Sequence, residues 1–176
     1  MKVRKMARCA LFAALLTLCA WLCVPVGDSA FTMQTFGVFL ALGLLGGKWG
    51  TVSILVYLLL GAAGAPVFSG FRGGVGALAG ITGGYLVGFL FSGLIYWFIT
   101  YLGKNTKKSQ LLAMVSGLLG CYLFGTIWFY FCYLQGGSTA GLGFILLKCV
   151  VPYVLPDAVK LALAFWLTQR LKRFVA

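Results

Sequence analysis

Histidine is absent from this 176-residue sequence, and only two of its residues are acidic, Asp28 and Asp157. Hydrolytic zinc sites, paired-carboxylate glycosidase sites and Ser-His-Asp triads all need residues that this chain lacks. The glycine-rich loop that binds ATP phosphates is missing too, because Gly47-Lys48 is followed by Trp49. We therefore expect no enzyme, no metal site, no cofactor and no ATPase activity of its own.

Charge of either sign is scarce: 9% of the residues are charged and 62% are apolar, with a mean hydropathy of +1.04. Soluble domains have about a quarter charged residues and about half apolar ones. The net charge of +12 comes from cations that are separated by apolar stretches, unlike the basic faces that bind nucleic acid. The six cysteines contain no Cys-x-x-Cys pair and lie in apolar runs, so they are expected as buried apolar residues. The sequence indicates an integral membrane protein.

The apolar runs predict an all-α membrane domain that comprises the whole chain. A hydrocarbon core of about 30 Å needs roughly 20 helical residues. Six transmembrane helices are expected over residues 7–26, 31–46, 49–63, 83–102, 111–134 and 156–171. The glycine-rich residues 64–80 are expected as an outer loop, because glycine at that density does not sustain a regular helix. Residues 141–151 are expected as a partly inserted extra helix before Pro152 and Pro156.

The first apolar run has a basic start, which also describes a cleaved signal peptide. Its length argues against cleavage, as does Asp28, which would occupy the −3 position of a cut after Ala30. We therefore expect a retained helix.

The distribution of cations predicts the orientation. With six spans and a cytoplasmic N-terminus, the C-terminus is cytoplasmic too, as the positive-inside rule favours. Cytoplasmic ends and loops then hold 11 of the 14 cations: Lys2, Arg4, Lys5, Arg8, Lys48, Lys104, Lys107, Lys108, Arg170, Lys172 and Arg173. Arg72, Lys148 and Lys160 are left on the outer half, together with both acids.

Asp157 and Lys160 are the first candidates for a binding site. They are three residues apart, so they share one helix face. An ionisable residue inside a membrane span costs about 2.5–3.5 kcal/mol unless it is paired or faces a polar cavity. The pair either makes the helix insertable or faces a cavity as ligand contacts. Pro156 suits the first position of a helix, which would place Asp157 in the favourable first turn.

Three further residues are candidates on the outer half. Gln34 offers both a donor and an acceptor, for a ligand or for an interhelical hydrogen bond. Arg72 is either a carboxylate clamp or a solvated loop cation. The aromatic residues Phe36, Phe68, Phe71 and Tyr85 are candidate pocket walls.

Ala10 and Ala14 lie on one face of the first helix, where small side chains allow another helix to approach closely. That helix belongs either to this chain or to a separate membrane subunit. A separate subunit could supply the energy for which this sequence contains no ATP-binding motif.

Four motifs in order resemble one family. They are Phe31-Thr-Met-Gln-Thr-Phe-Gly-Val-Phe39, the run from Tyr57 to Gly76, Thr82-Gly-Gly-Tyr-Leu-Val-Gly88 and Pro156-Asp-Ala-Val-Lys160. Together they are similar to BioY, the biotin-binding S component of energy-coupling-factor (ECF) vitamin importers. One departure is visible: Ile81 stands where the family often has proline, which should change loop stiffness more than ligand chemistry.

The resemblance implies the six-helix S-component fold, a prokaryotic plasma membrane location and a biotin site near the outer face. It implies that Asp157, Lys160 and Gln34 contact the ligand, with Tyr85 and Arg72 as further candidates. Ala10 and Ala14 match the family's docking motif for a transmembrane T component, which with two ATPases would supply the energy.

Biotin has a ureido ring, an apolar thioether ring and a carboxylate, and a pocket with one acid, cations, an amide and aromatic walls complements them. Whether Arg72 or Lys160 takes the carboxylate stays open. The alternatives are an S component for another vitamin, such as thiamine or riboflavin, and a membrane enzyme that uses Asp157 and Lys160 as an acid–base pair.

Overall fold

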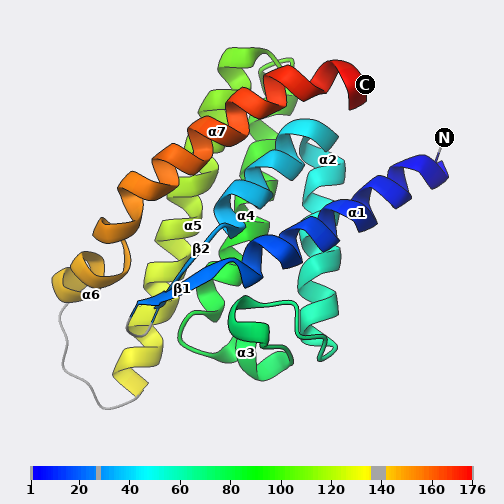
Figure 1. Cartoon of the computed structure of the whole chain (residues 1–176). Helices are drawn as coiled ribbons and strands as arrows, with labels where there is room; N and C mark the ends of the chain where they lie inside the picture. The colour runs from blue at the N-terminus through cyan, green and yellow to red at the C-terminus, as the bar shows by residue number, and fades with distance from the viewer. Residues whose placement is uncertain (1, 27–28, 136–141, 176) are drawn as a thin grey trace.

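The computed structural model describes residues 2–26, 29–135 and 142–175, and it is almost entirely helical. Figure 1 shows that the long helices form one bundle, with the N and C ends of the chain at the same end of the molecule. The elements in chain order are α1 (Lys2–Trp21), β1 (Cys23–Val26), β2 (Ser29–Thr32), α2 (Gln34–Ala62), the 3₁₀ turn η1 (Ser69–Phe71), α3 (Val75–Ala79), α4 (Gly83–Leu102), α5 (Lys107–Gln135), α6 (Leu142–Cys149) and α7 (Val151–Val175). Asp28 and Gly141 lie outside the described residues.

Helix α2 is a helical hairpin. Its interior Gly46 has φ 78° and ψ 167°, a left-handed conformation that favours glycine, and the helix axis reverses there. The two halves approach so closely that a Cβ on Gly50 would lie 2.7 Å from Cα of Leu42. The expected second and third spans are therefore the two halves of this hairpin.

Counted with α1, α4, α5 and α7, the halves of α2 give six crossing segments. Four described helical stretches are long and apolar enough to cross a membrane by length and composition: Gln34–Ala62, Gly83–Leu102, Lys107–Gln135 and Ile145–Lys172. Helix α1 does not meet that criterion, and its residues 2–8 include four cations. It packs Phe12 and Leu16 into the core cluster, and its Ala20 is fully buried.

The antiparallel hairpin of β1 and β2 was not expected from the sequence. Val24 pairs with Phe31, so Phe31 lies in a strand and not in a helix that begins there. Helix α2 begins at Gln34, whose backbone N–H donates to the Thr32 hydroxyl at 3.3 Å. The first helix ends at Trp21, five residues before the predicted end of its span.

The prediction for the start of the last helix is wrong. Helix α7 begins at Val151, and Pro156 lies inside it. Pro152 occupies the first turn instead, where the missing N–H of proline costs nothing. Asp157 is therefore more than one turn into the helix, and the expected help from the helix N-terminus does not apply.

The glycine-rich residues 64–80 fold against the lower end of the bundle in Figure 1 and contain η1 and α3. The Trp21 indole N–H donates to the carbonyl of Pro66 at 2.9 Å, and its ring lies 4.9 Å from that of Phe71. The segment is thus a packed cap on α1 and α2.

Candidate functional site

One cavity lies between the glycine-rich segment, strand β2 and helices α2, α4, α5 and α7. It encloses about 910 Å³ of space between atoms, including the part open to solvent. All five residues proposed from the sequence as ligand contacts line it, in the company of hydroxyl and aromatic side chains. The lining comprises Thr32, Gln34, Thr35, Phe68, Ser69, Arg72, Ala77, Thr82, Tyr85, Leu86, Phe89, Leu118, Cys121, Tyr122, Tyr153, Asp157 and Lys160.

Asp157 and Lys160 form a buried ion pair at the wall that α7 contributes. The Lys160 ammonium donates to Oδ1 of Asp157 at 2.8 Å, and both residues are 5% exposed. The same ammonium donates to the carbonyl of Thr32 at 2.6 Å and lies 4.0 Å from the ring centroid of Phe31. Strand β2 is thereby tied to α7 through Lys160.

Tyr122 on α5 completes this network. Its hydroxyl donates to Oδ2 of Asp157 at 2.6 Å, so each carboxylate oxygen already has one donor. An ionised carboxylate has about four lone-pair sites, which leaves room for further donors from the cavity. Sequence reasoning missed Tyr122, because its 35-residue separation from Asp157 carries no local signal.

Gln34 makes an interhelical hydrogen bond, one of the two roles that the sequence left open, and contact with a ligand stays a prediction. Its amide nitrogen donates to the Tyr57 hydroxyl at 2.7 Å, which is an interhelical bond within the α2 hairpin. Its amide oxygen accepts from the Thr32 hydroxyl at 3.2 Å, and the residue is 4% exposed while it lines the cavity. Two neighbours therefore fix the amide, and its orientation at the cavity is set before any ligand arrives.

The aromatic residues divide into two groups. Phe68 and Tyr85 line the cavity, with the Tyr85 hydroxyl 3.3 Å from that of Thr126. Phe36 packs against the core, and Phe71 lies on Trp21, so neither is a wall. Tyr153, which the sequence reasoning missed, also lines the cavity and stacks on Phe31 at 5.9 Å between ring centroids.

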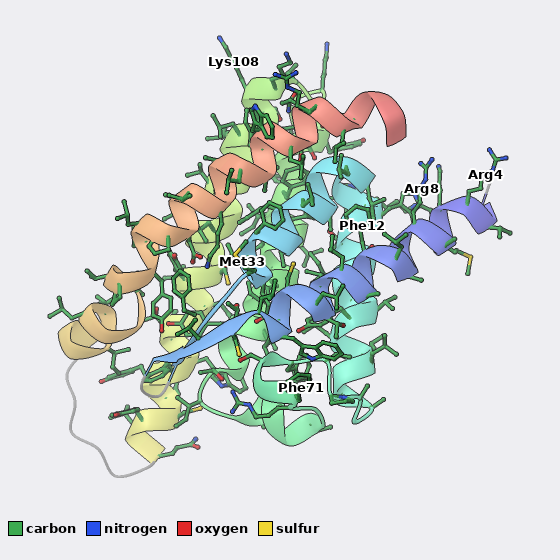
Figure 2. All side chains as sticks on the ribbon, in the orientation of Figure 1. Arg4, Arg8, Phe12, Met33, Phe71 and Lys108 are labelled. Atoms are coloured by element: carbon green, nitrogen blue, oxygen red, sulfur yellow. The ribbon has the colours of Figure 1, made fainter. Side chains whose placement is uncertain are left out.

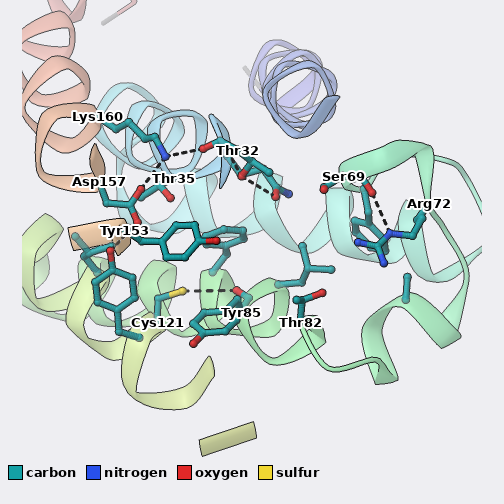
Figure 3. A pocket seen from close by; sticks show the side chains of 17 residues that line it. Thr32, Thr35, Ser69, Arg72, Thr82, Tyr85, Cys121, Tyr153, Asp157 and Lys160 are labelled. Atoms are coloured by element: carbon teal, nitrogen blue, oxygen red, sulfur yellow. Dashed lines mark hydrogen bonds and ion pairs between the residues drawn. The ribbon is translucent and has the colours of Figure 1, made fainter. Parts of the chain in front are cut away.

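Arg72 lies away from the ion pair. Figure 3 shows Lys160 and Asp157 at one side of the cavity and Arg72 at the other, beside Ser69. The exposed Arg72 donates through Nε to the Ser69 carbonyl at 3.1 Å, and it follows the 3₁₀ turn of the glycine-rich segment. The cavity is therefore charged at two separated places, with apolar rings and hydroxyls between them.

Ala10 and Ala14 do not pack inside the bundle. Both are exposed, and they share the outward face of α1 with Leu18, which is exposed as well. The interpretation of this pair as a contact within the chain is thus excluded for the described residues.

Comparison with known proteins identifies the fold and the family. The model of the BioY family matches residues 1–176. The chain is 36% identical over 174 residues to the biotin transporter BioY of Thermotoga maritima, with 97% of each chain covered. It is 38% identical over 172 residues to a probable biotin transporter BioY of Pyrococcus horikoshii, with 98% of each covered.

A solved structure agrees in fold. It is the crystal structure of the S-component for biotin from an ECF-type ABC transporter, with a TM-score of 0.85 at 27% identity. The match covers 98% of this chain and 92% of that one, which confirms the predicted multi-pass S-component fold. The chain belongs to the BioY family.

Proposed function

We propose that this protein is the biotin-binding subunit of a vitamin importer and that it delivers biotin to an ATP-driven ECF module. The observation that carries the proposal is the cavity with Asp157 and Lys160 buried together at one place and Arg72 at another. The biotin transporters among its relatives and the biotin S-component of like fold support it.

The ureido ring of biotin fits the ion-pair side of the cavity. Its two N–H groups need acceptors, and Asp157 offers the lone pairs that Lys160 and Tyr122 leave free. Its carbonyl needs a donor, which the ammonium of Lys160 can supply beside the two oxygens that it already contacts. Gln34 also lines the cavity, two residues after Thr32, and its amide offers both a hydrogen-bond donor and an acceptor.

The valerate carboxylate fits the side of Arg72. A guanidinium binds a carboxylate through two parallel hydrogen bonds, and among the described residues Arg72 donates through Nε to the Ser69 carbonyl, which leaves its terminal nitrogens for a ligand. Lys160 is committed to Asp157 and Thr32, so we assign the carboxylate to Arg72. Phe68, Tyr85 and Leu86 between them provide an apolar wall for the thioether ring. Biotin is the cargo in this proposal, and no cofactor takes part.

The partners follow from the outward face of α1. Ala10 and Ala14 are exposed at helical spacing, which suits close contact with a helix of a transmembrane T component. Two ATPase subunits on that component would supply energy that this chain does not produce. We place the assembly in the plasma membrane of a prokaryote, with the end that carries most cations in the cytoplasm.

An uptake assay tests the proposal as a whole. Cells that lack their own biotin importer would express this chain with or without an ECF module, and radiolabelled biotin would be counted. Uptake that requires both components, and that excess unlabelled biotin abolishes, is the expected result. Equal uptake of thiamine or riboflavin would favour the alternative of another vitamin, and chemically altered biotin would favour a membrane enzyme.

A further inference from the structure

A cationic cluster lies at the end of the bundle opposite the cavity. We use this name for Lys104, Lys107 and Lys108 before and at the start of α5, together with Arg170 and Lys172 near the end of α7. Figure 2 shows Lys108 at this end, on the first turn of α5, and Arg4 and Arg8 on the first turns of α1 at the other side of the end of α7. The cluster is separate from the residues that line the cavity.

A hydrogen bond brings the two parts of the cluster together. Gln169 on α7 donates through its amide nitrogen to the amide oxygen of Gln110 on α5 at 2.9 Å. Lys107 precedes Gln110 by three residues and Lys172 follows Gln169 by three, so each lies one turn beyond the bond on the same face. Both turns run toward the same end of the bundle. Lys107 and Lys172 therefore lie on the two sides of the junction between α5 and α7.

The loop before α5 is folded onto the same bond. The amide nitrogen of Gln110 donates to the side-chain oxygen of Asn105 at 2.9 Å and to its carbonyl at 3.1 Å. Gln110, at the centre of this network, is 2% exposed, while Asn105 is exposed and Gln169 is half-buried. The network holds the loop that carries Lys104 against the junction of α5 and α7.

Acidic side chains are absent from the described segments that carry the cluster. Residues 103–135 and 161–175 contain neither aspartate nor glutamate. Asp157 is thirteen residues before Arg170, about 20 Å along the helix, and it is paired with Lys160. Asp28, between strands β1 and β2 in the sequence, is the only other acid. The five cations of the cluster thus have no aspartate or glutamate of the described residues beside them, which leaves room for an anion from outside the chain.

The depth of the cluster matches a membrane interface. Trp166 on α7 is 57% exposed, and the Arg170 guanidinium lies 5.6 Å from its ring centroid. On the neighbouring face, Trp97 and Tyr101 are exposed near the end of α4. Tryptophan and tyrosine gather where hydrocarbon meets headgroups. The cations one turn beyond these rings therefore lie at headgroup depth.

We propose that the cationic cluster binds the phosphate headgroup of an anionic phospholipid at the junction of α5 and α7. Basic residues between membrane helices on the cytoplasmic side suit such headgroups, and Lys107 and Lys172 are the central contacts. The site goes beyond the proposed vitamin binding and does not depend on it.

Lipid binding to the full chain tests this proposal. The purified protein would be placed in nanodiscs of phosphatidylcholine with a small fraction of labelled phosphatidylglycerol, and the lipid that stays near the protein would be measured. Wild type should enrich phosphatidylglycerol. Lys107→Ala with Lys172→Ala should weaken that affinity about 25-fold, about fivefold per cation. Lys107→Arg with Lys172→Arg should retain it, which separates charge from folding.

The matched control removes two cations elsewhere at the same end, through Arg4→Ala with Lys48→Ala. It should change the affinity less than about twofold, since neither residue flanks the Gln110–Gln169 bond. An equal loss in the control would show diffuse attraction and overturn the site. Competition by soluble glycerol phosphate would also overturn the lipid site, and so would a wild-type protein without any lipid preference. The same holds if the Lys107→Ala with Lys172→Ala variant kept its lipid affinity but lost co-purifying protein partners.

Discussion

The Asp157–Lys160 pair combines two properties that conflict inside a membrane, because its groups are charged and buried at once. The pair is viable through three partners: the Thr32 carbonyl, the Tyr122 hydroxyl and the Phe31 ring. Removing one member of a buried pair leaves the other charge uncompensated, and this costs far more than the pair contributes. In the proposed function, the pair can therefore bind the ligand only while all its partners stay in place.

The first prediction concerns this pair. Asp157→Asn or Lys160→Ala should weaken biotin binding by about 2–5 kcal/mol, at least about 30-fold, because a buried polar partner of the ligand is lost. Titration calorimetry on monodisperse protein in detergent would measure the change, with Lys48→Ala as the control. Affinity equal to wild type in both variants would remove the pair from the site.

The second prediction concerns Tyr122 as a positioning residue. Tyr122→Phe removes one hydrogen bond to a carboxylate, worth about 1.5–3 kcal/mol, and leaves the ring in place. Biotin affinity should fall about tenfold through loss of the orientation of Asp157. Tyr130→Phe on the same helix, outside the cavity lining, should bind like wild type. Equal affinities in the two variants would contradict the role, and a second loss in the Asp157→Asn background would show that Tyr122 acts independently of Asp157.

Among single residues, the sequence predicted those that can be recognised from their neighbours in the chain. Asp157 and Lys160 share a face because they are three residues apart, and their charge in an apolar helix marks them. Tyr122 and Tyr153 reach the cavity only through packing of α5 and α7, and a tyrosine in a membrane helix is otherwise unremarkable. Such residues become visible only when the helices are placed.

Among the elements, the glycine-rich segment depends on contacts that admit no side chain. A Cβ on Gly61 would overlap the ring of Phe68, which lines the cavity, and the Gly61 carbonyl accepts from the N–H of Gly74 at 2.7 Å. This close approach holds the segment against α2. The wall of the cavity thus relies on glycine in a neighbouring helix.

The third prediction follows from that contact. Gly61→Ala should displace Phe68 and weaken biotin binding about tenfold, within the about 1–3 kcal/mol cost of overpacking. Gly76→Ala is the matched control, since a Cβ there meets nothing within 4 Å. The two affinities would be compared by calorimetry. Similar binding by both variants would show that the segment accommodates the methyl group without moving the wall.

The fourth prediction concerns the outward face of α1. Ala10→Trp and Ala14→Trp should preserve biotin binding, because both positions are exposed and away from the cavity lining. They should abolish co-purification with the transmembrane T component, because a bulky ring prevents close helix contact. Leu123→Trp, at a 67% exposed position of α5, is the control. Undiminished co-purification of the alanine variants would place the docking surface elsewhere.

Helices were predictable to within a few residues where apolar runs have clear ends, as for α4, which matches residues 83–102. The β1–β2 hairpin was not, because the residues of these four-residue strands continue the apolar runs that were predicted as the helical spans 7–26 and 31–46. The start of α7 was misplaced because two prolines could fill the same position. In each case the decisive factor is a tertiary contact or a choice between equivalent local signals.

At the scale of the whole molecule, the main feature is that the buried ion pair and most of the cations lie at opposite ends of the bundle. The buried acid and its lysine lie at one end, most cations lie at the other, and six crossing segments put the N and C ends together. From the same pattern we predict the orientation, and in the proposed function it sets the side from which biotin enters and the side on which energy would be supplied. The number of crossings and the cation count were accessible from the sequence because both follow from hydropathy and topology.

Binding of biotin to the purified protein in detergent tests the central claim most directly, with thiamine and riboflavin as controls. We predict saturable binding of one biotin per chain, no binding of the other two vitamins, and the weaker binding given above for Asp157→Asn. Folded protein that binds no biotin, or that binds all three vitamins alike, would contradict it.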